Sequence, residues 1–191
     1  MTYETKEHTP LLHWYALRVT YGREKTASDY LQSQGVATFC PMQKVVKQIG
    51  GKRVAVMRSR LPNIFFAYGS EQQIQTYVYD NVRLPYLRFY YRQERVGGIV
   101  RREPLIVPDS QMLTFRIICD ASDVDTFVSP DKIRMFEKGQ TVRVVGGIFT
   151  GAVGRVARFR GQQRVGIYID GMATVATAYV PNAFLEPITT E

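Results

Sequence analysis

The chain has 191 residues, of which 45% are hydrophobic and 12% aromatic, so it can form packed cores in one domain or two small ones and is not wholly disordered. No apolar run is long enough to span a membrane or resembles a signal peptide, and we expect a cytoplasmic protein. The net charge of +8 indicates a polyanion such as nucleic acid as partner, or an acidic protein surface; a basic protein with neither partner is the alternative.

The first half of the chain alternates strand patterns with helix patterns. Residues 13–21 (HWYALRVTY) are rich in aromatic and β-branched residues and predict a strand, and residues 22–35 have apolar positions at helical spacing. A short strand is expected at 36–42. Residues 43–60 predict a β-hairpin, because two β-branched arms flank Gly50-Gly51, which tolerate the positive φ of a tight turn.

The same alternation continues after the hairpin. A strand (61–69), a helix (70–81) that begins with the capping box of Ser70 and Gln73, a strand (82–93) and a helix (107–120) follow. Together these elements predict an α+β sandwich, in which helices pack on a mainly antiparallel sheet.

The composition changes near residue 120. Residues 120–135 are polar and acidic and predict a linker. Residues 136–191 contain short β-like runs separated by glycine, which predict a small β-barrel. We therefore divide the chain into a flexible tail (1–12), an α+β domain (13–119), the linker and the barrel domain.

Residues suited to catalysis or metal binding are scarce. The two cysteines, Cys40 and Cys119, form no Cys-x-x-Cys pair, which excludes a zinc ribbon or a thioredoxin motif. A catalytic triad or a histidine-rich metal site would need His8 or His13, the only histidines. We expect no catalytic residue, no metal and no cofactor.

The stretch GGIFTGAVG (146–154) has two glycines with the spacing of a phosphate-binding P-loop. The Lys-[Ser/Thr] pair that would reach the phosphates and magnesium is absent, and the following residues alternate like a strand. The glycines therefore predict turns and close packing between barrel strands.

This stretch and its surroundings, FEKGQTVRVVGGIFTGAVGRVARFRG, resemble the KOW motif of NusG-type transcription elongation factors, an SH3-like barrel. The matching positions are Gly139, Gly147, Phe149, Gly151 and Gly154. WYALRVTYGREKTASDYL, the Gly-Gly hairpin and the Leu-Pro strand are similar to the NusG N-terminal domain, an RNP-like sandwich. The resemblance runs from Trp14 to Ile188, and the ending ATAYVPNAFLEPI looks most like the UpxY-type paralogues, operon-specific antiterminators of capsular polysaccharide operons.

The resemblance implies a non-enzymatic factor that binds the clamp helices of the largest RNA polymerase subunit and suppresses pausing or termination. The positions that match the polymerase-binding surface are Trp14, Tyr15, Leu61, Pro62 and Ile64. The family commonly has Phe-Pro-Gly-Tyr where this chain has Leu-Pro-Asn-Ile. The alternative is that Trp14 and Ile64 are core residues.

Basic residues form three candidate contacts with DNA or nascent RNA. They are Arg23 and Lys25 at the first helix; Lys44, Lys47, Lys52, Arg53, Arg58 and Arg60 on the hairpin; and Arg155, Arg158, Arg160 and Arg164 on the barrel. The alternative is a solvated surface, on which lysines prevent edge-to-edge aggregation. Arginines between residues 83 and 102 alternate with aromatic residues. One interpretation is that both kinds of side chain stack on unpaired bases, and the other is that the aromatic residues point into the core and the arginines point outward.

NusG binds Rho and a small ribosomal protein through a loop of its barrel, and one position of that loop is apolar. At the matching position this chain has Asp170. The acid argues against contact with Rho or the ribosome. We expect a monomer. The competing hypotheses are a KOW-type RNA-binding or ribosome-associated protein, and an enzyme with an unrecognised site.

Overall fold

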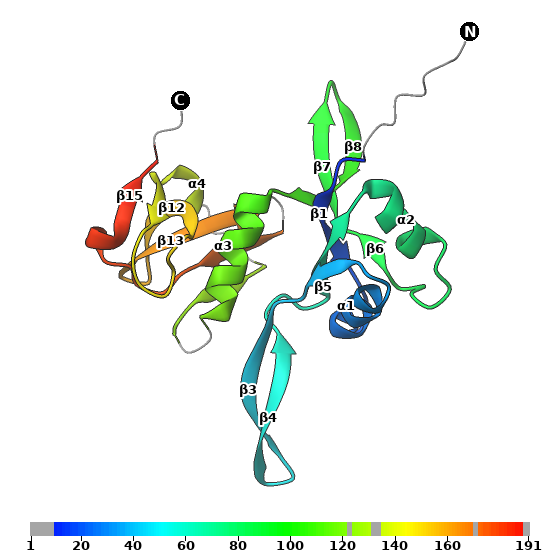
Figure 1. Cartoon of the computed structure of the whole chain (residues 1–191), viewed down its shortest axis with the longest axis horizontal. Helices are drawn as coiled ribbons and strands as arrows, with labels where there is room; N and C mark the ends of the chain where they lie inside the picture. The colour runs from blue at the N-terminus through cyan, green and yellow to red at the C-terminus, as the bar shows by residue number, and fades with distance from the viewer. Residues whose placement is uncertain (1–9, 122–123, 131–134, 170–171, 189–191) are drawn as a thin grey trace.

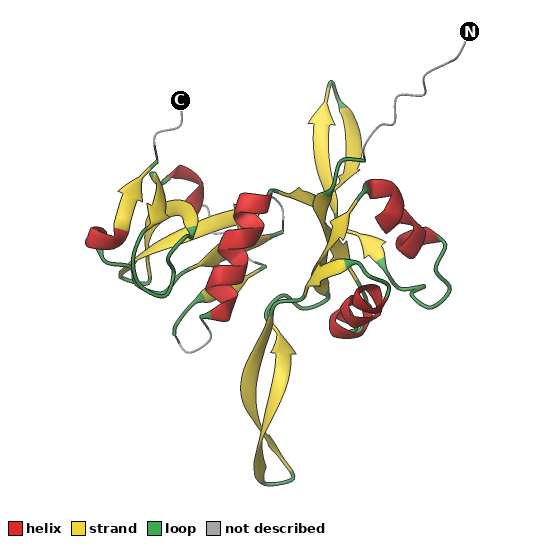
Figure 2. Ribbon diagram, viewed as in Figure 1, coloured by secondary structure: helices red, strands yellow, loops and turns green. Residues whose placement is uncertain are grey.

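The computed structural model describes residues 10–121, 124–130, 135–169 and 172–188 (Figure 1). Its N-terminal half is a sheet with helices on both faces, and its C-terminal half is built on an antiparallel six-stranded sheet (Figure 2). The predicted α+β class is therefore confirmed.

Strand β1 (His13–Arg18) lies at the centre of the N-terminal sheet. The strands have the order β2-β5-β1-β6, with β2 at Ala37–Phe39, β5 at Ile64–Gly69 and β6 at Arg88–Phe89. Strand β9 (Ile106–Val107) pairs with β1 beside β6, and all these pairings are antiparallel. The aromatic and branched residues of β1 suit a strand that has neighbours on both edges.

Alternating side chains divide this sheet into two apolar faces. Tyr15 and Leu17 belong to one buried cluster with residues of α1 (Glu24–Ser33) and α2 (Glu71–Tyr79). Trp14 and Ala16 belong to the other cluster, with α3 (Asp109–Asp120). The predicted cap of α2 is confirmed on the Ser70 side, because its side chain accepts a hydrogen bond from the N–H of Gln73.

Two hairpins project from the N-terminal half in opposite directions (Figure 1). The first, the β3–β4 arm, joins β3 (Met42–Ile49) to β4 (Lys52–Ser59) and confirms the predicted hairpin. The second, the β7–β8 arm, joins β7 (Tyr91–Val96) to β8 (Ile99–Pro104). The sequence prediction missed the second hairpin and assigned one strand ending at residue 93. The turn at Gly97-Gly98, with φ of 58° and 83°, reverses the chain there.

The C-terminal sheet has the order β10-β14-β13-β12-β11-β15. Its elements in chain order are β10 (Phe127–Ser129), α4 (Met135–Lys138), β11 (Thr141–Val144), β12 (Val153–Phe159), β13 (Gln162–Ile169), β14 (Ala173–Ala176), a 3-10 turn (Asn182–Phe184) and β15 (Leu185–Pro187). Strand β10 lies within the predicted linker and pairs with β14. Part of that segment is thus incorporated into the C-terminal sheet, while the domain boundaries themselves stay predictions.

Helix α3 joins the two halves. Its buried residues belong to one apolar cluster that runs from Ala16 and Phe66 of the N-terminal sheet to Val142 and Val165 of the barrel. The Thr114 hydroxyl accepts a hydrogen bond from the N–H of Val153 and lies at the same 2.9 Å from the Val153 carbonyl, to which it donates. Figure 2 shows α3 between the two halves.

Gly154 shows why the glycine run is needed for packing. A Cβ atom at this position would lie 2.6 Å from the carbonyl oxygen of Gly166 on the neighbouring strand. Gly151 has a φ of 90° in the preceding turn. The run therefore serves a turn and a close strand contact, as the sequence predicted.

We expect Gly154→Ala to destabilise the protein by about 3 kcal/mol, because the new methyl group collides with backbone that cannot move independently. Thermal or urea unfolding of the full chain measures this loss. Gly161→Ala is the matched control, because its Cβ would meet nothing within 4 Å and only its φ of 77° opposes alanine, at about 1 kcal/mol. Equal losses for both variants would contradict the packing role.

Candidate functional site

The β3–β4 arm presents basic side chains on both of its faces. Its register places Lys44 and Arg53 on one face and Lys47, Lys52 and Arg58 on the other. All five are exposed, and residues 42–60 contain no acid. The arm can therefore neutralise phosphates whichever face it turns to nucleic acid.

Apolar side chains on the same arm are also open to solvent. Val46 is 67% exposed, Ile49 56% and Met57 61%. An arm that only resisted aggregation would not need them, since exposed apolar strands promote aggregation. Their combination with basic residues suits a surface that becomes covered by a negatively charged partner.

The turn that begins β5 is shaped by Pro62 and Asn63. The N–H of Ile64 donates to the carbonyl of Leu61 at 3.1 Å, and Asn63 has a φ of 64°. Proline at the second position and a left-handed residue at the third are typical of a type II turn. Asn63 thus occupies the position at which the family that the sequence resembles commonly has glycine.

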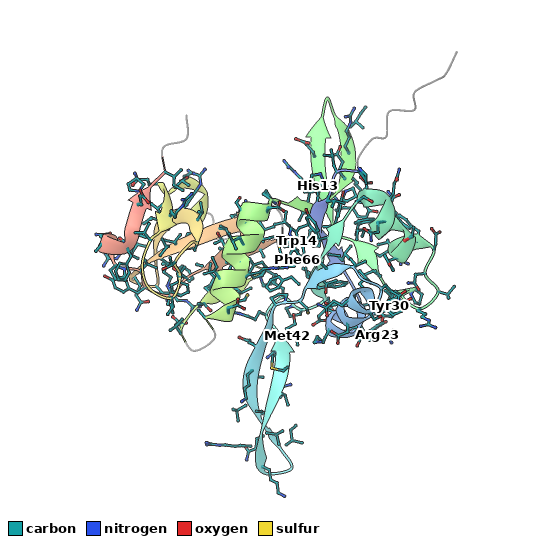
Figure 3. All side chains as sticks on the ribbon, in the orientation of Figure 1. His13, Trp14, Arg23, Tyr30, Met42 and Phe66 are labelled. Atoms are coloured by element: carbon teal, nitrogen blue, oxygen red, sulfur yellow. The ribbon has the colours of Figure 1, made fainter. Side chains whose placement is uncertain are left out.

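Asn63 also orders the loop before α1. Its side-chain oxygen accepts a hydrogen bond from the N–H of Gly22 at 2.9 Å. In that loop the Arg23 guanidinium lies 4.7 Å from the ring centre of Tyr86, and Tyr21 is 88% exposed. Lys25 is paired with Asp29 one helical turn away. Of the two predicted phosphate contacts here, Lys25 is thus held by an acid, whereas Arg23 (labelled in Figure 3) is exposed and lies beside aromatic rings.

The five predicted polymerase-binding residues do not form one exposed surface. Leu61 is completely buried, Ile64 is 8% exposed, and both belong to the cluster that contains α3 and the barrel. Tyr15 is buried on the opposite sheet face, with α1 and α2. Trp14 is half-buried beneath the Arg116 guanidinium, 4.6 Å from its ring centre, and only Pro62 is exposed.

The barrel arginines divide into two groups. Arg155, Arg158 and Arg160 are exposed, whereas Arg164 is 1% exposed. The Arg164 guanidinium donates to the backbone carbonyl and the carboxylate of Asp125, both at 2.6 Å, and to the Thr177 carbonyl at 3.1 Å. Arg164 therefore holds the preceding segment on the barrel and is not available to nucleic acid in this arrangement, contrary to the predicted nucleic-acid contact and also to the alternative of a solvated face.

Arg60 is engaged in a similar way. Its guanidinium donates to the hydroxyl of Thr126 at 2.7 Å and to the Thr126 carbonyl at 3.2 Å. The neighbouring residues Asp125 and Thr126 are thus held by arginines from the two halves of the molecule. We call these four residues the linker clasp. Arg164 also lowers the pKa of the Asp125 carboxyl below its usual value, through its hydrogen bond and its charge.

Two other features concern the predictions. Asp170, the predicted marker of the barrel loop, and residues 1–9 of the tail lie outside the described residues. The β7–β8 arm was missed, although RVGGIV carries the same Gly-Gly turn signal that predicted the first hairpin.

Within the part of the chain that the structure describes, no helix has the length and apolar character needed to cross a bilayer.

A family model described as "Transcription termination factor nusG" matches residues 12–116. No curated protein matches the chain. Among solved structures, the chain is similar to a NusG of Thermotoga maritima, described as "Domain interaction in Thermotoga maritima NusG". The two are 17% identical, the match covers 94% of this chain and 98% of the other, and the TM-score is 0.44.

We expect Arg164→Ala to lower the free energy of unfolding by about 3 kcal/mol, because it removes a completely buried side chain and its hydrogen bond to the carbonyl of the buried Thr177. Arg158→Ala, an exposed change on the adjacent strand, should cost less than about 0.5 kcal/mol. Asp125→Asn should cost less than Arg164→Ala, since its side chain is 69% exposed. Chemical denaturation of the three variants measures these differences, and equal stability of the two arginine variants would contradict the clasp.

Proposed function

The chain belongs to the NusG family of non-enzymatic transcription factors, and we propose that it is an elongation and antitermination factor that binds the clamp helices of RNA polymerase. The family match over residues 12–116 carries this proposal, because it covers the N-terminal sheet, α1, α2, both arms and the first part of α3. By binding there, the protein would suppress pausing or termination. It would act as a monomer in the cytoplasm.

The turn of Leu61–Ile64 is the proposed polymerase contact. Pro62 is exposed and provides the first contact. Leu61 and Ile64 can take part only when the apolar cluster around them opens, because almost none of their surface is accessible. Polymerase binding and the packing of α3 on the barrel therefore compete for the same apolar residues. Trp14 supports the surface from the adjacent strand, and Tyr15 from behind it.

Nucleic acid is the proposed second partner. The β3–β4 arm and Arg23 would contact the phosphates of DNA close to the polymerase, and Arg155, Arg158 and Arg160 those of nascent RNA. Such contacts depend on charge and carry little sequence information. They would keep the factor on the transcription complex rather than select a gene.

An operon-specific role is the finer part of the proposal. It is supported by the likeness of the hairpin, the Leu-Pro strand and the ending ATAYVPNAFLEPI to UpxY-type antiterminators. We propose that the protein serves an operon of the capsular polysaccharide type. Asp170 supports a barrel that does not couple to Rho or the ribosome.

We expect Pro62→Glu to weaken binding to the polymerase clamp helices at least tenfold, because it places a charge at the centre of an apolar contact. Pull-down of the purified polymerase by the full chain measures this, together with read-through in a defined transcription assay. Pro85→Glu is the control, since it is the same change at another exposed loop proline. Unchanged unfolding temperatures would show that both variants fold.

Two outcomes would contradict the polymerase proposal. One is that the wild-type chain neither binds the clamp helices nor alters pausing. The other is equal binding by Pro62→Glu and Pro85→Glu. Co-purification with ribosomes instead of polymerase would favour the KOW-type ribosome-associated alternative.

For the β3–β4 arm, Lys47→Gln with Lys52→Gln should flatten the dependence of log affinity for duplex DNA on log salt concentration by about 1.8, which corresponds to two lost phosphate contacts. Lys138→Gln with Arg143→Gln removes the same net charge from exposed positions around the barrel. This control pair should leave the slope nearly unchanged. Equal slopes for the two double variants would remove the arm from the interface.

A further inference from the structure

The β7–β8 arm is a second exposed projection, distinct from the β3–β4 arm. Every residue from Tyr91 to Glu103 whose side chain the structure describes is exposed. The arm points away from the β3–β4 arm (Figure 1). It contains none of the three predicted groups of basic contacts, although its arginines belong to the run between residues 83 and 102 for which stacking on bases is one interpretation. It contributes no residue to the two apolar clusters, so the fold itself does not explain its length.

The root of the arm is firmly held. The hydroxyl groups of Tyr91 and Tyr79 of α2 are hydrogen-bonded at 2.5 Å, and the rings of Tyr91 and Phe89 meet edge to face. The N–H of Leu105 donates to the Tyr90 carbonyl at 2.8 Å, directly beside β1. Residues further out on the arm therefore have a defined direction relative to the sheet.

The register shows that the two faces of the arm differ in charge. Opposite residues of an antiparallel pair point to the same side. On one side Arg92 is opposite Glu103, and Glu94 is opposite Arg101. Each arginine there faces an acid, so this side carries no net charge. We call it the balanced face.

The other side carries two arginines and no acid. Gln93 is opposite Arg102, and Arg95 is opposite Val100. Arg95 and Arg102 are diagonal neighbours, roughly 7 Å apart at their backbones. Two like charges at this distance repel one another, and a bound anion would relieve the repulsion. We call Gln93, Arg95, Val100 and Arg102 the basic face.

We propose that the basic face binds the phosphate backbone of nucleic acid, as a contact separate from the β3–β4 arm. This proposal deepens the proposed function, because it relies on nucleic acid being present at the transcription complex. Tyr91 and Pro104 lie on the same side at the root of the arm, where the Tyr91 hydroxyl is hydrogen-bonded to that of Tyr79. Beyond the root, Val100 is the only apolar residue on this side, so the outer part of the face lacks the large apolar anchors on which protein interfaces depend. Two guanidinium groups beside an amide suit the oxygens of a phosphate chain.

The test compares two double variants of the full chain that remove the same charge from the same arm. Arg95→Gln with Arg102→Gln changes the basic face, and Arg92→Gln with Arg101→Gln changes the balanced face. Affinity is measured against salt concentration for one random sequence prepared as duplex DNA, single-stranded DNA and single-stranded RNA. Circular dichroism and the unfolding temperature confirm that each variant folds.

We expect the basic-face variant to lose about tenfold in affinity, with a salt slope smaller by about 1.4 to 1.8 on the strand type that the arm contacts. The balanced-face variant should change affinity less than about twofold. The strand type on which the difference appears identifies the source of the phosphates.

Equal losses for both variants, or no loss on any of the three nucleic acids, would overturn the proposal. So would loss of polymerase binding by the basic-face variant with nucleic-acid affinity unchanged, because the face would then bind protein. Polymerase pull-down with the wild-type chain is scored separately. Its failure would reject the proposed function, while the nucleic-acid slopes would still decide the role of the arm.

Discussion

The packing of α3 between the sheet and the barrel is the constraint on which the rest of the molecule depends. Phe115 meets Phe39 and Phe66 of the sheet edge to face, at ring-centre distances of 5.3 and 5.6 Å. Thr114 and Ile117, on the same helix, lie against the barrel at Val153 and Gly151. One helix therefore completes an apolar layer in each half, and the accessibility of Leu61 and Ile64 depends on the same cluster.

The linker clasp adds directional contacts to this apolar packing. Arg60 and Arg164 come from different halves, and they hold adjacent residues of the connecting segment. Hydrogen bonds from a charged donor are stronger than those between neutral groups, and they fix a direction that apolar contacts do not. The clasp and β10 together hold the segment on the barrel surface, which shortens the free connection between the halves.

Some of the positively charged side chains are used for contacts within the molecule, and others are exposed. The arginines of the clasp and Arg116 over Trp14 are used inside the molecule. Exposed cations remain on the two arms, in the loop before α1 and on the barrel. The two arms differ: the β3–β4 arm is basic on both faces, and the β7–β8 arm on only one. Not every one of the 25 lysines and arginines can therefore reach a phosphate.

The sequence by itself determined the local features. Turn glycines, strand alternation and the Ser70 cap act over a few residues, so the first hairpin, α2 and the fold class were predictable. The β7–β8 arm was missed because the aromatic run before it was assigned to a single strand that ended at residue 93, before the Gly-Gly turn. Only the tertiary structure decided which side chains are free: Arg164 and Asp125 are 39 residues apart, and Arg60 and Thr126 are 66 apart. Burial and pairing depend on such distant neighbours, and no local pattern along the chain records them.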